Sequence, residues 1–129
     1  MAERVVERTL SDGGLSIHYR LERLGGDLLL TVTGGAAHVG CVVLATHRQS
    51  LTGSGADSAD SSVLNRSGHK DEFLLRALAE RLSAVAGCAV AAVGGVHYDG
   101  LDQHGLRSAA HIEQQALAQA EDWAAELLP

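Results

Sequence analysis

The sequence predicts an α+β fold, in which a mainly antiparallel sheet of five or six strands and two long helices form a two-layer sandwich. The chain has 129 residues, which suits one compact domain, residues 1–129, and is too short for two. Hydrophobic residues make up 46% of it and aromatic residues only 3%, so a core of Val, Leu and Ala must come from a sheet covered by Ala-rich helices. Strand patterns fill the first part of the chain and helical patterns the later part, an order typical of α+β folds.

Three short strands are expected near the start of the chain. Residues 5–10 form a β-branched run, and the turn SDGG at 11–14 leads to a second run at 15–23. Apolar and polar residues alternate in this second run, as expected for a strand with one buried face. The turn LGGD then leads to a third strand at 27–33.

A fourth strand and a long loop are expected next. Residues 38–46 are almost continuously apolar, which indicates a central strand covered on both faces. Joined by tight turns, the four strands would form an antiparallel meander. Residues 47–68 are rich in Ser, Gly and Asp without a sustained period, which predicts a mobile loop.

A helix and a fifth strand follow this loop. Leucines recur at helical spacing within 70–87, with Ser67 as the expected N-cap and Gly87 as the residue that ends the helix. Residues 88–96 are apolar and unusually small. They predict a strand that a helix or a ligand can approach closely.

A long helix is expected at the C-terminal end, with Asp102 as its cap. Its apolar stripe is expected to contain Leu106, Ala109, Ile112, Ala116, Leu117, Ala120 and Trp123.

The charge and the opening residues argue against several classes of protein. The formal net charge is −6 and Lys and Arg do not cluster, so a nucleic-acid-binding protein is not expected. The opening MAERVVERTL lacks the apolar centre of a signal peptide, and no apolar run approaches the roughly 18 residues of a membrane span. Cys41 and Cys88 lie in apolar contexts without CxxC spacing, which suits reduced, buried thiols. We therefore expect a cytoplasmic protein that binds neither nucleic acid nor a membrane.

Polar residues end the small-residue strand in the segment GGVHYDG, residues 94–100. His97 and Asp99 are two positions apart, so their side chains leave the same face if the strand extends that far. An imidazole and a carboxylate at this spacing suit a metal ion or an oriented acid–base pair. The alternative is a simple turn, with Asp99 as an Asx-turn residue and His97 capping the core.

His38 begins the predicted central strand, and Gly40 beside it leaves room for a ligand. A lone His at such a place is more often a hydrogen-bonded structural residue than a ligand. If the strands at 38–46 and 88–96 are neighbours, His38 and His97 would meet at one edge of the sheet.

The segment SGHKDE, residues 67–72, has features of an anion site. The free backbone N–H groups at a helix start favour an anion, Gly68 permits close approach and Lys70 adds a positive charge. This predicts a site for one phosphate, although an ordinary capped helix explains the same residues. P-loop, GxGxxG, GxSxG and HExxH motifs are absent, which favours a binding protein over an enzyme.

Three segments together resemble the LpdD-like family: HVGCVVLA at 38–45, LNRSGHKDE at 64–72 and GGVHYDG at 94–100. Its members are small D subunits associated with decarboxylases of gallate and other hydroxyarylic acids, and are described as prenylated-flavin chaperones. The resemblance implies a fold like that of proteasome assembly chaperones. It also implies a non-catalytic protein that holds prenylated FMN and helps deliver it to a UbiD-type decarboxylase.

The same resemblance implies a set of site residues. The candidates for a divalent metal or for the flavin phosphate are His38, His69, His97 and Asp99. The other candidates for cofactor binding are Asn65, Ser67, Gly68, Lys70, Gly95 and Tyr98.

Two other functions and one oligomeric state are also considered. A small metalloenzyme would use His97, Asp99 and a further His on a divalent ion. An assembly subunit would contact the decarboxylase without binding a ligand. A homodimer is expected because the predicted two-layer sheet has one small-residue strand and exposed ends.

Overall fold

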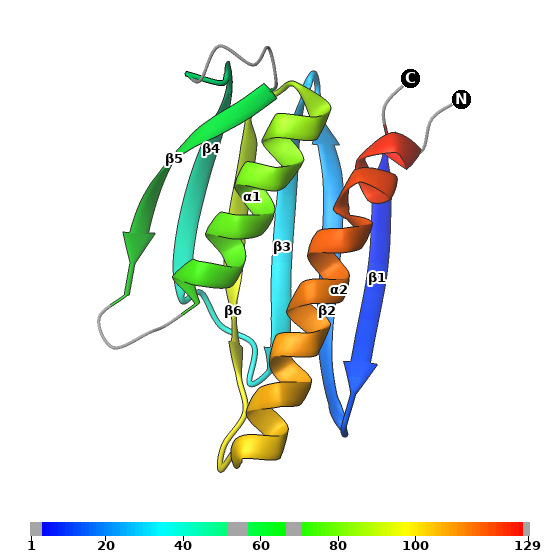
Figure 1. The fold of residues 1–129 in the computed structure, drawn as a ribbon, viewed down its shortest axis with the longest axis vertical. Helices are drawn as coiled ribbons and strands as arrows, with labels where there is room; N and C mark the ends of the chain where they lie inside the picture. The colour runs from blue at the N-terminus through cyan, green and yellow to red at the C-terminus, as the bar shows by residue number, and fades with distance from the viewer. Residues whose placement is uncertain (1–3, 52–56, 67–70, 128–129) are drawn as a thin grey trace.

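The computed structural model describes residues 4–51, 57–66 and 71–127. These residues form a six-stranded sheet with two helices packed on one side of it (Figure 1). The elements in chain order are β1 (Val5–Asp12), β2 (Leu15–Leu24), β3 (Asp27–Gly35), β4 (Cys41–Gln49), β5 (Asp57–Asn65), α1 (Glu72–Ala86), β6 (Val90–His97) and α2 (Gln103–Leu127).

The sheet has the strand order β1-β2-β3-β6-β4-β5. Strands β3 and β6 pair in parallel, and the other neighbours pair antiparallel. The predicted α+β fold with a mainly antiparallel sheet is therefore confirmed. The predicted four-strand meander is wrong, because β6 inserts between β3 and β4. The small residues of β6 let it serve as a central strand. The position of β6 in the sheet depends on packing between distant segments, which local periodicity does not report.

Strand β5 corrects the prediction of a mobile loop at 47–68. The described part of that segment completes β4 and then forms β5, paired along its length with β4. The Nε of Arg48 donates to Oδ1 of Asp60 over 2.8 Å, and Nε2 of His47 lies 2.9 Å from Oδ1 of Asp57. The strand lies at the edge of the sheet, where polar and charged residues are common because one side faces solvent. Its composition therefore resembles that of a loop.

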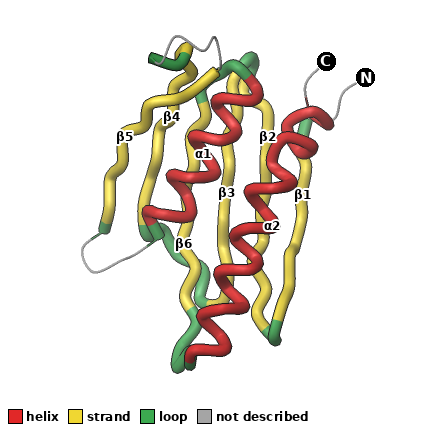
Figure 2. The backbone as a smooth tube through the Cα atoms, viewed as in Figure 1, coloured by secondary structure: helices red, strands yellow, loops and turns green. Residues whose placement is uncertain are grey.

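Both helices cover one face of the sheet and leave the other face open (Figures 1 and 2). The core between sheet and helices includes Tyr19 and Trp123, whose ring centroids are 5.3 Å apart. Strand β4 shows the division clearly, since Val43 is fully buried whereas Leu44 is 50% exposed. The expectation that this strand is covered on both faces is wrong, because both helices of the described residues lie on the same face of the sheet.

The ends of the helices fit most of the expected caps. Gly87 has φ 68° and its N–H donates to the carbonyl of Ser83, so it ends α1 as predicted. Asp102 Oδ1 accepts the N–H of Gly105 over 2.9 Å, as expected of the N-cap of α2. Asp71, rather than the predicted Ser67, holds the N-cap position of α1 and makes no side-chain capping bond there.

The thiols of Cys41 and Cys88 are free, as predicted, and burial raises the pKa of both. Cys41 is buried and Cys88 only partly so. Within the described ranges, neither helix combines the length and the apolar character needed to span a membrane.

Candidate functional site

A cleft of about 740 Å³ lies between the two helices and the ends of β2 and β6. Helix α2 has 25 residues and α1 has 15, and the first half of α2 continues past the start of α1 (Figures 1 and 2). This part of the sheet is therefore covered by α2 alone. The cleft is lined by Leu15, Ile17, His38, Asp71, Phe73, Leu74, Val96, His97, Tyr98, Leu101, Leu106, Ala109 and Glu113. Its volume is within the range of about 300–1,000 Å³ typical of ligand pockets.

His38 and Asp71 form an ion pair at one wall of the cleft. Nε2 of His38 lies 3.1 Å from Oδ2 of Asp71, and the side chains are only 19% and 10% exposed. Nδ1 of His38 lies 2.9 Å from the carbonyl of Ala36. Both ring nitrogens of His38 thus lie within hydrogen-bond distance of an oxygen atom.

Asp71 also binds the end of β6, since its Oδ1 accepts the N–H of Val96 over 2.8 Å. One carboxylate therefore joins the start of α1 to the segment before β4 and to β6. This arrangement fixes the first turn of α1, which carries Phe73 and Leu74 into the cleft wall.

Two glycines make room for this ion pair. A Cβ at Gly95 would lie 2.5 Å from Nε2 of His38, and a Cβ at Gly40 would collide with the carboxylate of Asp71. The small residues of β6 thus allow close approach to the strand, as expected. The group that approaches is the imidazole of His38 in the same chain. The predicted contact between Gly95 and a flavin stays a prediction.

His97 and Asp99 form a second imidazole–carboxylate pair at the mouth of the cleft. Nε2 of His97 lies 2.8 Å from Oδ1 of Asp99, and the side chains are 57% and 97% exposed. Their predicted convergence is confirmed. The ring centroids of His38 and His97 are 6.5 Å apart, which confirms that the two histidines meet because β4 and β6 are neighbours.

The described structure does not support the predicted divalent metal. Among residues 4–51, 57–66 and 71–127, no group of three or more His, Cys, Asp or Glu side chains is placed to hold a metal ion. Nε2 of His38 faces Asp71 rather than the pair of His97 and Asp99. The fourth metal candidate, His69, lies outside the described residues.

The remaining candidates divide into residues at the cleft, away from it and outside the described chain. Tyr98 lines the cleft, and its hydroxyl accepts the N–H of Ser16 over 2.9 Å and donates to the carbonyl of the same residue. Nδ2 of Asn65 donates to Oε1 of Glu72 over 2.6 Å, and Asn65 is not part of the cleft wall. The predictions for Ser67, Gly68 and Lys70 concern residues outside the described ranges.

Sequence reasoning missed most residues of the cleft wall as site residues, among them two exposed apolar and two acidic side chains. Phe73 is 79% exposed and Leu106 is 58% exposed, although helical periodicity assigns Leu106 to the apolar stripe of α2. Each is an apolar side chain on a helix that covers the sheet, so no local signal separates it from a core residue. Asp71 and Glu113 also line the cleft, and neither belongs to a motif that marks it.

Glu113 and Tyr19 are polar groups without hydrogen-bond partners in this region. Burial raises the pKa of Glu113, which has no hydrogen bond or ion pair with any described residue. The hydroxyl of Tyr19 is buried and also lacks a partner in the described part of the chain. Burial, and then the negative charge of Glu113, raise the pKa of Tyr19, so the two groups are near each other.

Comparisons with known proteins add a family and a fold. A sequence profile described as the prenylated flavin chaperone LpdD-like domain matches residues 11–125, a range that contains the whole cleft wall. A search of curated proteins gave no match. Among solved structures, the chain is similar to one in the crystal structure of a novel chaperone complex for yeast 20S proteasome assembly, at 14% identity and a TM-score of 0.51. The match covers 98% of this chain and 100% of that one. It confirms the predicted likeness of fold.

Replacing Asp71 with Ala should destabilise the fold. The substitution leaves the His38 ring and the N–H of Val96 without their acceptor. We expect the free energy of unfolding to fall by about 1–3 kcal/mol, measured by urea unfolding with the fluorescence of Trp123 as the signal. Asp99→Ala is the matched control, because its imidazole partner is exposed, and it should stay within about 0.5 kcal/mol of the wild type. Equal stability of Asp71→Ala and wild type would contradict the structural role of the buried pair.

Proposed function

Since the chain belongs to the prenylated flavin chaperone LpdD-like family, we propose that it binds prenylated FMN in the cleft and delivers it, in the cytoplasm, to a UbiD-type decarboxylase. The family is one of chaperones, and the protein is accordingly an accessory protein rather than an enzyme. One observation carries the proposed binding site. A mainly apolar cleft of about 740 Å³ lies within the segment that matches the family.

The cleft wall suits the ring system of a flavin. Phe73 and Leu106 expose large apolar surfaces there, and exposed apolar surface next to a concave site is typical of a ligand-binding region. An aromatic side chain can stack on a flat ring system. We therefore assign Phe73, with Tyr98 nearby in the wall, to contact with the flavin ring.

The phosphate group requires a separate anchor. No Lys or Arg is among the described residues of the cleft wall, and the imidazole of His38 already faces the carboxylate of Asp71. The phosphate site predicted from the sequence consists of Ser67, Gly68 and Lys70, which lie directly before Asp71 in the chain. We propose that they hold the phosphate.

Delivery requires that the cofactor can leave. An exposed Phe73 and an open wall give contact area without a closed cage. Such contacts favour moderate affinity, because part of the ligand stays accessible to solvent and to a partner. This accessibility supports transfer to a decarboxylase over permanent storage.

Replacing Phe73 with Ala should weaken binding of prenylated FMN. Loss of the ring contact should cost about 1–2 kcal/mol, or roughly 5- to 30-fold in Kd, measured by anaerobic spectroscopic titration. Leu64→Ala is the control, since Leu64 is 76% exposed on β5 and is not part of the cleft wall. Its Kd should equal that of the wild type.

The same titration separates the chaperone from the alternatives. An assembly subunit or a metalloenzyme would show no binding of prenylated FMN at micromolar concentration, and this result would overturn the proposal. If the wild type binds, mixing the loaded protein with a cofactor-free UbiD-type decarboxylase should move the flavin to the enzyme. Flavin that stays with the loaded protein would contradict the delivery role.

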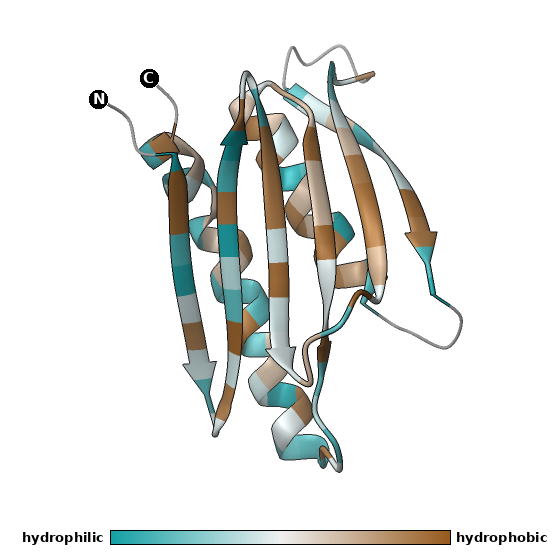
Figure 3. Ribbon diagram, turned by 180° about the vertical axis from the view of Figure 1, so that it is seen from behind, coloured by the Kyte–Doolittle hydropathy of each residue, from teal (hydrophilic) through white to brown (hydrophobic). Residues whose placement is uncertain are grey.

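The open face of the sheet supports a homodimer, which we propose as the state in solution. In the half formed by β3, β6, β4 and β5, strands β3, β6 and β4 carry many apolar residues, whereas most of β5 is polar and only its end is apolar (Figure 3). The register aligns Val93, Val42 and Leu64 in one row across this half, and Leu29, Ala91 and Leu44 in the next. Leu44 and Leu64 are exposed. Contiguous exposed apolar surface of this kind is typical of an interaction site.

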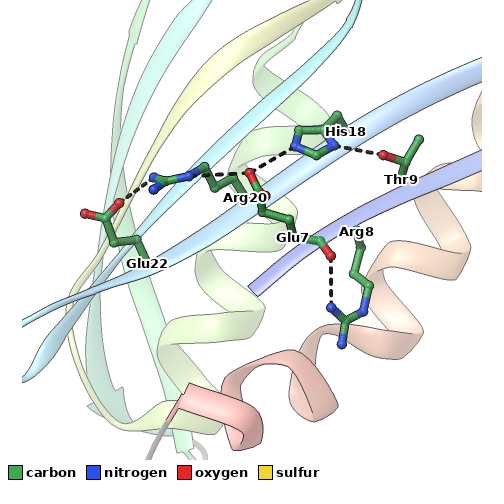
Figure 4. Close-up of polar contacts among 6 residues, drawn as sticks. All are labelled: Glu7, Arg8, Thr9, His18, Arg20 and Glu22. Carbon is green, nitrogen blue, oxygen red and sulfur yellow. Dashed lines mark hydrogen bonds and ion pairs between the residues drawn. The ribbon is translucent and has the colours of Figure 1, made fainter. Parts of the chain in front are cut away.

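The half of the open face formed by β1 and β2 carries charges of both signs (Figure 4). Nε of Arg20 lies 3.6 Å from Oε1 of Glu7, and Arg20 also pairs with Glu22. Nδ1 of His18 lies 2.8 Å from the hydroxyl of Thr9. This cluster is self-complementary, because each copy offers both a carboxylate and a guanidinium.

A second copy fits this division better than a purely apolar partner. A two-fold axis that runs across the strands would bring the apolar half of one copy against the apolar half of the other. The two mixed-charge halves would meet in the same way. Such an isologous contact is the commonest form of homodimer, and face-to-face packing of sheets is common.

Replacing Leu44 with Arg should give a monomer. The side chain is half exposed, so the charge is tolerated in the free subunit but would be buried at the contact. Gel filtration with light scattering should show a dimer for the wild type and for the control Leu51→Arg, whose position is exposed beyond the end of β4. A monomeric wild type, or a Leu44→Arg variant that remains dimeric, would exclude this interface.

A further inference from the structure

Glu113 differs from the other ionisable residues of the cleft wall. His38 is bound to Asp71, and His97 is bound to Asp99. Glu113 lines the same cleft but forms no hydrogen bond or ion pair with any residue that the structure describes. It is therefore the acidic group of the wall that is available to a ligand.

The surroundings of Glu113 favour its neutral form. Its neighbours one turn away on α2 are apolar: Ala109, Ala110, Ala116 and Leu117. From the sheet, the near ionisable group is the hydroxyl of Tyr19, which is neutral at ordinary pH, and the start of α1 contributes Asp71, already bound to His38. Burial raises the pKa of Glu113, and no cation among the described groups opposes this effect.

A neutral carboxyl group has a specific pattern of hydrogen bonding. It presents an O–H donor beside a C=O acceptor on one small planar group. The pyrimidine part of a flavin ring carries the complementary pattern, an N–H flanked by two carbonyl groups. In an apolar wall, two such hydrogen bonds fix the orientation of the ring, because the alternative leaves buried polar groups unpaired.

We propose that Glu113 recognises the imide edge of the bound flavin, donating one hydrogen bond to a ring carbonyl and accepting one from the ring N–H. This inference rests on the proposed function of the cleft. The buried hydroxyl of Tyr19 is a second polar group near Glu113 without a hydrogen-bond partner among the described residues, although Tyr19 does not line the cleft. Glu113 is thus a specificity-determining residue, while Phe73 supplies apolar contact.

The role of Glu113 makes flavin affinity depend on pH. The neutral carboxyl is the binding form, so affinity is fully present below the raised pKa of Glu113 and falls as the pH rises through it. Deprotonation removes the donor and places a negative charge against the ring carbonyl. The bond is therefore strongest below this raised pKa and weakens above it.

Titration of prenylated FMN into Glu113→Gln and Glu113→Ala tests this assignment. Glutamine keeps a donor beside an acceptor but does not titrate, so this variant should match the wild type below the pKa of Glu113 and keep its affinity above it. Alanine should weaken binding by about tenfold below the pKa of Glu113, where the wild type binds best. Glu121→Gln, on the exposed side of α2 and paired with Arg81, is the matched control and should follow the wild-type pH profile.

Each result of this titration is decisive. If Glu113→Ala binds prenylated FMN as tightly as the wild type at every pH, the role of Glu113 is overturned. The proposed function is then left intact. A Glu113→Gln profile that falls with pH as the wild type does would overturn it as well. If wild type and all variants bind no prenylated FMN at any pH, the proposed function fails, and the inference fails with it.

Discussion

The ion pair between His38 and Asp71 is the constraint on which the rest of the cleft depends. It is largely buried, and its carboxylate also holds the N–H of Val96. Removing one partner of such a contact is costly, because the remaining polar group stays largely buried and loses that hydrogen bond. The pair joins the segment before β4, the start of α1 and the end of β6, three parts that are distant in sequence. The requirement for Gly40 and Gly95 follows from it, because a larger residue at either position would displace the imidazole or the carboxylate.

The two faces of the sheet have different physical roles. The helices α1 and α2 cover one face. The cleft lies on this face, where α2 extends past the start of α1. The other face has no helical cover, and exposes an apolar half beside a half with charges of both signs (Figures 3 and 4). A protein that carries a cofactor needs one surface for the cofactor and others for its partners. The single helical layer leaves the open face available without disturbing the cleft.

Much of the fold could be predicted from the sequence because local patterns carry it. Alternation predicted β2, leucine spacing predicted α1, and Gly87 and Asp102 marked helix ends correctly. Strand β5 was missed because an edge strand is polar and resembles a loop. The insertion of β6 depends on packing between distant segments. At the site, the spacing of His97 and Asp99 predicted their contact, whereas Asp71, Phe73 and Glu113 act through their positions in space, which no motif reports.

The central claim is that the cleft, and not the open face, receives the prenylated flavin. Hydrogen–deuterium exchange of the wild-type protein, with and without prenylated FMN, tests this claim most directly. The account predicts slower amide exchange on binding at 15–17, 71–74, 96–101 and 106–113, the segments that line the cleft. At the edge strands β1 and β5, amide exchange should be the same with and without flavin. Slower exchange confined to the open face, or no change at the cleft despite saturating flavin, would contradict it.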